Sequence, residues 1–107
     1  MKTLKIAMAL AFVAGAAVAA YAADKTINQK GKVFSESEIT VKKGESVNFL
    51  NDDNIVHNVM STSAGNEFNV GAAKPGTATP VTFKNAGDVR VICAIHPSMK
   101  LLVKVVE

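Results

Sequence analysis

A short segment near the C-terminal end of the chain contains three residue types that bind metals. It reads Cys93-Ala-Ile-His96-Pro-Ser-Met99, and the only other histidine of the chain is His57, far upstream. Two imidazoles, one thiolate and one thioether form the ligand set of a blue-copper site, in which the histidines and the cysteine are trigonal and the methionine is weak and axial. The sulfur ligands suit Cu(I) and the imidazoles suit Cu(II). The pattern therefore predicts one copper ion that cycles between the two states.

Each of these residues also has an ordinary structural role when it is considered alone. A cysteine at the end of an apolar strand is most often a buried core thiol, and Met99 would commonly fill the core. His57 would be a hydrogen-bonded strand residue, and His96, before a proline, a solvent-facing loop residue. Because both histidines and the only cysteine fall into one ligand pattern, we favour a metal site over four unrelated roles.

The first 22 residues have the three zones of a secretory signal peptide. Lys2 and Lys5 give a positive start, residues 6–20 form an apolar run, and Ala20-Tyr-Ala22 provides the small-x-small pattern of a cleavage site. The run is shorter than the roughly 20 residues that a membrane-spanning helix needs. We therefore expect cleavage after Ala22, export to the periplasm and no membrane span in the mature chain.

Without this leader, the chain is nearly neutral and poor in aromatic side chains. Removing the two leader lysines from the 12 basic residues leaves ten basic against nine acidic residues, a net charge of +1. Residues 23–107 contain neither tyrosine nor tryptophan, so charge and stacking surface give no support for nucleic-acid binding. The lone cysteine excludes an intramolecular disulfide, and a bound metal would help to stabilise so small an exported domain.

The residues after the leader favour short strands joined by turns. Alternating or continuous apolar residues predict strands at 37–41, 46–50, 55–60, 67–70, 80–84, 89–93 and 101–106. Dense turn residues separate several of them, as at 42–45, 51–54 and 85–88. No segment shows a convincing helical period. Six to eight short strands with regular turns predict an all-β fold, a two-sheet Greek-key β-sandwich.

From Ile39 onward the chain resembles the cupredoxins, the family of blue copper proteins. The similar features are the opening Ile39-Thr-Val-Lys-Lys-Gly-Glu-Ser-Val-Asn-Phe49, the stretch Asn51-Asp-Asp, the triplet His57-Asn58-Val59 and the Cys-x-x-His-Pro-x-Met loop. The two-residue gaps in this loop are typical of amicyanins, to which plastocyanin and pseudoazurin are related; in plastocyanin-like proteins the gap before the methionine is longer. Ile95 and Ser98 depart from the amicyanin pattern, which has a proline and an aromatic residue there.

The resemblance implies a single cupredoxin-like copper-binding domain in residues 23–107 with one type-1 copper. It implies that Asn58 joins the two ligand segments by hydrogen bonds, and that the copper ligands are His57, Cys93, His96 and Met99. The implied function is a periplasmic electron carrier, not an enzyme. Partners such as a c-type cytochrome or a periplasmic dehydrogenase would dock transiently near His96, since a shuttle must release its partner as readily as it binds. We also expect the carrier to be a monomer.

Two other functions would use the same residues. A copper storage or delivery module would share the ligands, but such proteins often carry further methionines and histidines in open loops, and only Met60 and Met99 follow the leader. A thiol enzyme would use Cys93 as nucleophile and His96 as base, yet no oxyanion-donor pattern accompanies the pair. Both remain alternatives to the electron carrier.

Overall fold

The computed structural model describes residues 25–107, which form strands and turns without a helix. The strands are β1 (Lys25–Lys30), β2 (Val33–Phe34), β3 (Glu38–Lys42), β4 (Ser46–Asn51), β5 (Met60–Ser61), β6 (Phe68–Asn69), β7 (Ala78–Thr82), β8 (Gly87–Ile92) and β9 (Lys100–Val106). Among these residues, no helix is long and apolar enough to cross a membrane. The signal peptide predicted for residues 1–22 lies outside the described residues and stays a prediction.

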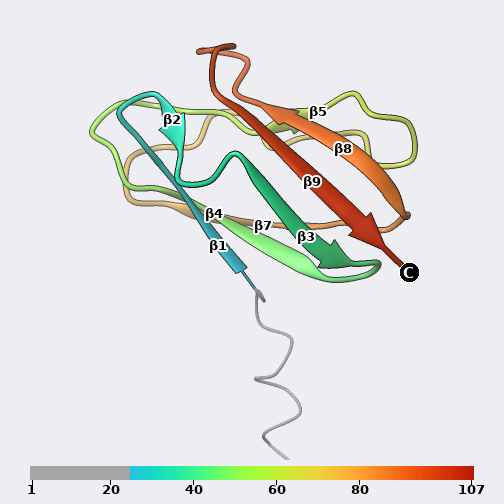
Figure 1. The fold of residues 1–107 in the computed structure, drawn as a ribbon. Coiled ribbons are helices and arrows are strands. Elements are labelled where there is room, and N and C mark those ends of the chain that lie inside the picture. Colours follow the sequence, from blue (N-terminus) through green and yellow to red (C-terminus); the bar gives the residue numbers. More distant parts are fainter. Residues whose placement is uncertain (1–24) are drawn as a thin grey trace, which may run out of the picture.

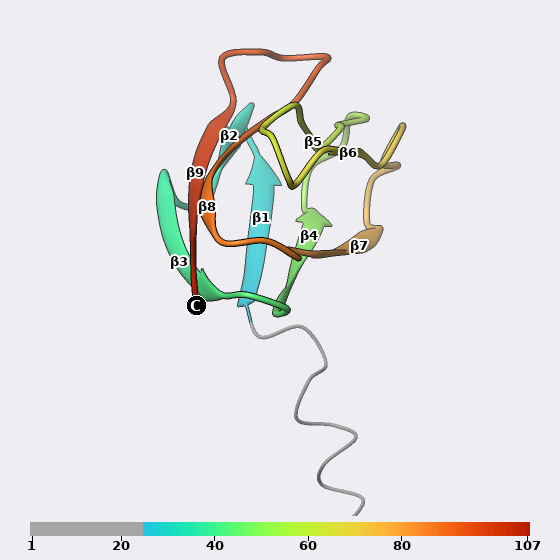
Figure 2. The same ribbon diagram turned by 90° about the vertical axis from the view of Figure 1, so that its right-hand side faces the viewer.

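The strands form two sheets that pack on each other as the layers of a sandwich (Figures 1 and 2). One sheet has the order β2-β1-β4-β7 and the other the order β3-β9-β8-β5-β6. Strand β1 runs parallel to β4, and β3 runs parallel to β9, whereas the other neighbours are antiparallel. The chain passes repeatedly from one sheet to the other. The all-β Greek-key β-sandwich predicted from the sequence is confirmed.

Apolar side chains fill the space between the sheets. In β4 the buried residues alternate with partly exposed ones, so that Val47 and Phe49 face the core. This period of two follows from the backbone of a strand, which directs successive side chains to opposite faces. Phe34 packs edge-on against Phe49, and Phe68 against Phe83, with ring centroids 6.2 and 5.9 Å apart. These phenylalanines therefore belong to the hydrophobic core or, in the case of Phe68, pack against it.

Two strands precede the region in which the sequence predicted strands, so residues 25–107 form nine strands where six to eight were expected. The hairpin of β1 and β2 supplies them, and β1 lies inside its sheet between β2 and β4. In β1 the buried positions are Ile27 and Gln29. Because one of the two core-facing residues is polar, the alternation that would indicate a strand is hidden in the sequence.

Both segments that carry the candidate ligands are less regular than predicted. Of the strand expected at 55–60, only Met60 is in a strand, and His57 forms an isolated bridge with Ala73. The carbonyl of Ile55 accepts a hydrogen bond from the Asn51 side chain, so it is not used for strand pairing. The strand expected at 89–93 ends at Ile92, which makes Cys93 the first residue of the loop between β8 and β9.

Candidate metal centre

Three of the four candidate ligands meet at one end of the sandwich. Figure 1 shows the loop between β8 and β9, which carries Cys93 and His96, at the end of the molecule away from the C-terminus. The Cys93 Sγ lies 4.0 Å from the Nδ1 of His57 and 3.8 Å from the Nδ1 of His96. The ligand atoms of the three residues all lie within 4.8 Å of one another. One metal–sulfur bond of about 2.3 Å and one metal–nitrogen bond of about 2.0–2.1 Å can bridge each of the two distances from the Cys93 sulfur.

The loop is closed by its own backbone. The Met99 N–H donates to the His96 carbonyl at 2.9 Å, and the Cys93 N–H donates to the Met99 carbonyl at 3.4 Å. Short gaps between the candidate ligands make this closure possible. Met99, the fourth candidate, thus belongs to the same loop as Cys93 and His96, and its side chain is buried in the hydrophobic core.

The site is shielded from solvent except at one residue. His57 and Cys93 are both 0% exposed, whereas His96 is partly exposed. The burial of His57 follows from its bridge to Ala73, in which each residue donates its N–H to the other's carbonyl, at 3.1 and 2.8 Å. The exposed edge of the site is therefore the His96 imidazole.

Asn58 joins the two ligand segments, as the resemblance implied. Its backbone N–H donates to the Cys93 Sγ at 3.3 Å, and its side-chain oxygen accepts from the Ala94 N–H at 3.0 Å. Its amide nitrogen donates to Asn69 Oδ1 at 2.9 Å and to the Gly71 carbonyl at 2.8 Å. One residue thus fixes three loops around the sulfur, and its N–H favours the thiolate that a metal requires.

Asp53 holds the other side of His57. Its Oδ2 lies 3.0 Å from the His57 Nε2. An ionised carboxylate can only accept hydrogen bonds, so in this contact the ring donates from Nε2, and Nδ1 is the nitrogen that faces the Cys93 sulfur and can bind a metal. The hydrogen bond from His57, followed by that from the Asn54 N–H, holds the pKa of Asp53 below its ordinary value of 3.8. The carboxylate is therefore ionised near neutral pH.

Two residues of this environment were missed in the sequence. Asp53 belongs to a predicted turn and to the stretch shared with the cupredoxins, but no role at the site was predicted for it, although an acidic residue four positions before a candidate ligand histidine is a usable indication. Gln29 is completely buried on β1 and donates from Nε2 to the Asn58 carbonyl at 3.1 Å. No local pattern could have identified it, because it reaches Asn58 only through the pairing of β1 with β4.

Copper fits this group of residues. The thiolate is a soft ligand, the two imidazoles present their Nδ1 atoms to it, and a buried thioether follows in the same loop. This combination suits both oxidation states of copper. The hydrogen bonds of Asn58 and Asp53 orient Cys93 and His57, as residues around metal ligands commonly do.

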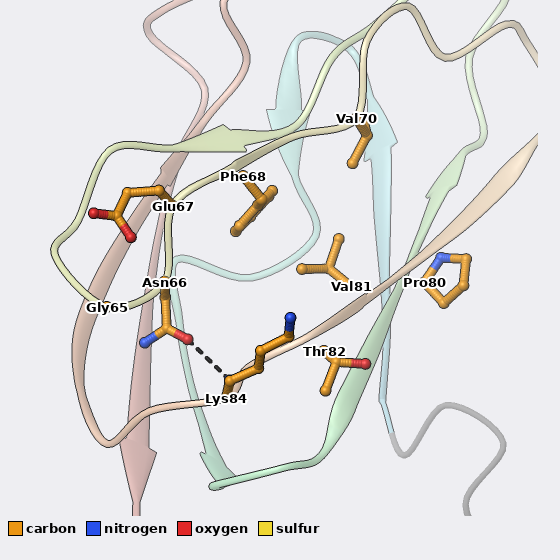
Figure 3. A pocket seen from close by; sticks show the side chains of 9 residues that line it. All are labelled: Gly65, Asn66, Glu67, Phe68, Val70, Pro80, Val81, Thr82 and Lys84. Carbon is orange, nitrogen blue, oxygen red and sulfur yellow. Dashed lines mark hydrogen bonds between the residues drawn. The ribbon is translucent and has the colours of Figure 1, made fainter.

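The metal centre is separate from a hollow on the side of the sandwich. The hollow has a volume of about 450 Å³. It lies between the segment around β6 and strand β7 (Figure 3). At one end the Asn66 side chain accepts a hydrogen bond from the Lys84 N–H at 2.9 Å. None of the residues lining this hollow is a candidate ligand. The metal centre lies instead at one end of the sandwich, in the region of the loop between β8 and β9.

Fold and site together define a small β-sandwich protein that binds one copper ion. Residues 21–106 match the family of copper binding proteins, plastocyanin/azurin family. The chain belongs to this family, and copper is its cofactor. The resemblance to the cupredoxins is thereby confirmed.

Solved structures with the same fold include several copper proteins. A Cu(I) form of an amicyanin variant is 27% identical with a TM-score of 0.71, and the match covers 81% of this chain and 88% of that chain. A purple cupredoxin from Nitrosopumilus maritimus is 23% identical with a TM-score of 0.67, over 77% of this chain and 99% of that chain; at this identity it shows the fold alone.

A larger protein contains the same domain. The Cu-containing nitrite reductase from Thermus scotoductus SA-01 is 25% identical with a TM-score of 0.70, and the match covers 77% of this chain but 22% of that chain. The chain thus spans about a fifth of that protein. None of the curated proteins compared with the chain matches it in sequence.

Proposed function

We propose that this protein carries single electrons between redox proteins of the periplasm and is not an enzyme. The observation that carries the proposal is the burial of the site, in which His57 and Cys93 are fully shielded and His96 alone of the three is partly exposed. An electron can enter through one exposed imidazole edge. A substrate, in contrast, cannot reach a completely buried thiol, which argues against a thiol enzyme.

Bound copper supplies the one-electron couple of Cu(II) and Cu(I). His57, His96 and Cys93 would hold it through two nitrogens and one sulfur, and Met99 would add a weaker fourth ligand from the same loop. The closed loop and the hydrogen bonds of Asn58 keep these residues in one arrangement. Because the protein groups are already in place, little reorganisation accompanies each electron transfer.

Exposed apolar side chains next to the histidines offer a docking surface. Ile55 and Val56 precede His57, Ile95 precedes His96, and all three are exposed large hydrophobic residues. A contiguous apolar patch on a protein surface is typical of an interaction site, and we propose that these three side chains form one. A partner such as a c-type cytochrome or a periplasmic dehydrogenase would dock there transiently. The signal-peptide pattern of residues 1–22 supports the periplasmic location, and a small patch of this kind suits a monomer that releases its partner readily.

Voltammetry of the copper-loaded mature chain, followed by stopped-flow mixing with a reduced c-type cytochrome, tests the proposal. We expect reversible cycling with retention of copper, and electron exchange with the cytochrome. Loss of copper on reduction would instead indicate a delivery protein. Absence of exchange with both a cytochrome and a dehydrogenase would contradict the carrier function.

A pair of matched variants locates the docking surface. Ile95 is 50% exposed beside His96, and Val106 is 45% exposed at the end of β9. We expect Ile95→Ser to slow the exchange about tenfold, equivalent to about 1.4 kcal/mol, without a change of potential. Val106→Ser should leave the rate unchanged. Equal effects of the two substitutions would place the docking surface elsewhere.

A further inference from the structure

The carboxylate of Asp53 lies where a ligand segment meets the β1–β2 turn. Its Oδ2 is 3.0 Å from the His57 Nε2 and also accepts the N–H of Gly31 at 3.0 Å. Its Oδ1 accepts the N–H of Asn54 at 2.9 Å. The Asp53 side chain is 15% exposed, so the group is mostly shielded from water. Three donors therefore converge on one carboxylate that contacts a copper ligand.

The position of this carboxylate is fixed by the backbone on both sides. Gly31 and Lys32 form the β1–β2 turn with φ values of 65° and 61°, both in the left-handed region. This conformation is rare for a residue with a side chain such as Lys32. The turn directs the Gly31 N–H at Asp53, while the Asp53 N–H donates to Asn51 Oδ1 at 3.0 Å. Asp53 thus needs no rearrangement to hold His57.

We propose that Asp53 is a positioning residue of the copper site that holds His57 as the Nε2–H tautomer and favours Cu(II) over Cu(I). A carboxylate that accepts the second ring proton of a ligand histidine fixes the orientation of the ring and raises its basicity as a ligand. The negative charge lies one imidazole away from the metal position. Since Cu(II) carries the larger charge, it gains more from this carboxylate than Cu(I) does. Asp53 thereby lowers the reduction potential.

The inference deepens the proposed electron-carrier function, because it concerns the potential of the same site. Its readouts are metal affinity, potential and the tautomer of His57, and none of these needs a redox partner. Failure of the protein to exchange electrons with a cytochrome would leave them unaffected. The two proposals can therefore fail separately.

Asp53→Asn in the copper-loaded mature chain removes the charge and keeps an amide oxygen that can accept from His57. We expect the affinity for Cu(II), measured by competition with chelators, to fall about tenfold or more, and the affinity for Cu(I) to change much less. A tenfold difference between the two corresponds to a potential about 59 mV higher for a one-electron couple. The visible spectrum confirms that the site is still formed.

Asp52→Asn is the matched control. Asp52 is adjacent and exposed, and within residues 25–107 its carboxylate makes no hydrogen bond. The control removes the same charge from the same turn, so we expect a much smaller change of potential. Equal shifts in the two variants, or an unchanged potential in Asp53→Asn with the blue site intact, would overturn the proposal.

A measurement on the unsubstituted protein covers the case in which Asp53→Asn does not fold. Nitrogen-15 and proton NMR of the diamagnetic Cu(I) form reports which His57 nitrogen carries the proton. We expect an Nε2–H resonance that exchanges slowly with water, because this group is buried and hydrogen-bonded. A His57 ring protonated at Nδ1, or an Nε2–H that exchanges as fast as that of a free histidine, would also overturn the proposal.

Discussion

At the scale of single residues, the Cys93 sulfur is the atom on which the other groups of the site converge. It faces the Nδ1 atoms of His57 and His96 and accepts the Asn58 N–H. The sulfur is completely buried, which keeps it from the oxidants that attack exposed thiolates. A thiolate in this position can donate charge to bound Cu(II), and that transfer is the origin of the intense colour of a blue-copper site.

The colour of the Cu(II) form therefore depends on Cys93. We expect Cys93→Ser to lose the intense blue absorption, whereas Met99→Ala keeps it with a changed reduction potential, because a weak axial ligand tunes the potential. Met60→Ala, in β5, is the control and should keep both colour and potential. Visible spectroscopy and voltammetry measure these outcomes. A Cys93→Ser protein that remains intensely blue would exclude the thiolate as a ligand.

Asp53 gives the metal-free protein a defined pH dependence. Because its pKa is lowered in the folded state, chiefly by the hydrogen bond from His57, its stabilising contribution is complete above the pKa of the unfolded chain. It is lost as the pH falls through the lower pKa of the folded state. Denaturant unfolding from roughly pH 5 to pH 2 should show a steeper loss of stability in the wild type than in Asp53→Asn. Identical slopes in the two proteins would contradict this.

At the scale of elements, the metal centre depends on loops that the sandwich brings together. Hydrogen bonds of Asn58 connect the segment at His57 to the Cys93 loop and to the loop around Gly71. Gln29, on β1 of the four-stranded sheet, donates a hydrogen bond to the Asn58 carbonyl and so connects Asn58 to that sheet. The loops are thus fixed to both layers rather than to each other alone.

Removing the Asn58 side chain should therefore destabilise the protein as well as disturb the metal centre. Asn58→Ala leaves the N–H of Ala94 and the carbonyl of Gly71 without their partners. We expect a loss of about 1 kcal/mol or more in the free energy of unfolding, since a typical hydrogen bond contributes about 0.5–1.5 kcal/mol and these groups are only partly buried. Urea denaturation measures the loss. Asn48→Ala is the control, because among residues 25–107 the Asn48 side chain makes no hydrogen bond; a loss as large in the control would exclude the specific role of Asn58.

At the scale of the whole molecule, we expect copper binding and folding to be coupled. His57 and Cys93 lie far apart in the sequence and approach each other only when the two sheets have formed. A ligand bound by the folded state alone stabilises it by about 2.7 kcal/mol at a free concentration of 100 times its Kd. The family of this chain and the exported location that we propose make copper the relevant ligand.

Thermal unfolding should reveal this coupling directly. The melting temperature of the mature chain should rise with copper concentration. His57→Ala should abolish most of this rise, because the substitution removes one of the buried copper ligands. The melting temperatures of the wild type and of His57→Ala without copper give the cost of the substitution itself. This cost can then be separated from the effect of lost copper binding. Superimposable melting curves for the wild type with and without copper would show that the metal does not bind the folded state preferentially.

The sequence by itself determined the features that depend on neighbouring residues. The spacing of Cys93, His96 and Met99 places three candidate ligands on one tight loop, whatever the rest of the fold does. Alternating apolar residues, as in β4, identify the core-facing side of a strand because the side chains of a strand alternate with a period of two. Ligand chemistry and the all-β class follow from such local patterns.

The tertiary structure alone decided which distant residues meet and which atoms face the metal. His57 reaches the Cys93 loop through its bridge to Ala73, and the buried Gln29 on β1 supports Asn58 through the pairing of β1 with β4. Asp53 contacts the His57 Nε2, which leaves Nδ1 for the metal. The contacts of His57 with Ala73 and of Gln29 with Asn58 join residues that are far apart along the chain. The contact of Asp53 with His57 depends on how the chain turns between these two residues. They arise when sheet pairing and core packing fix the loops in space, and no local periodicity records them.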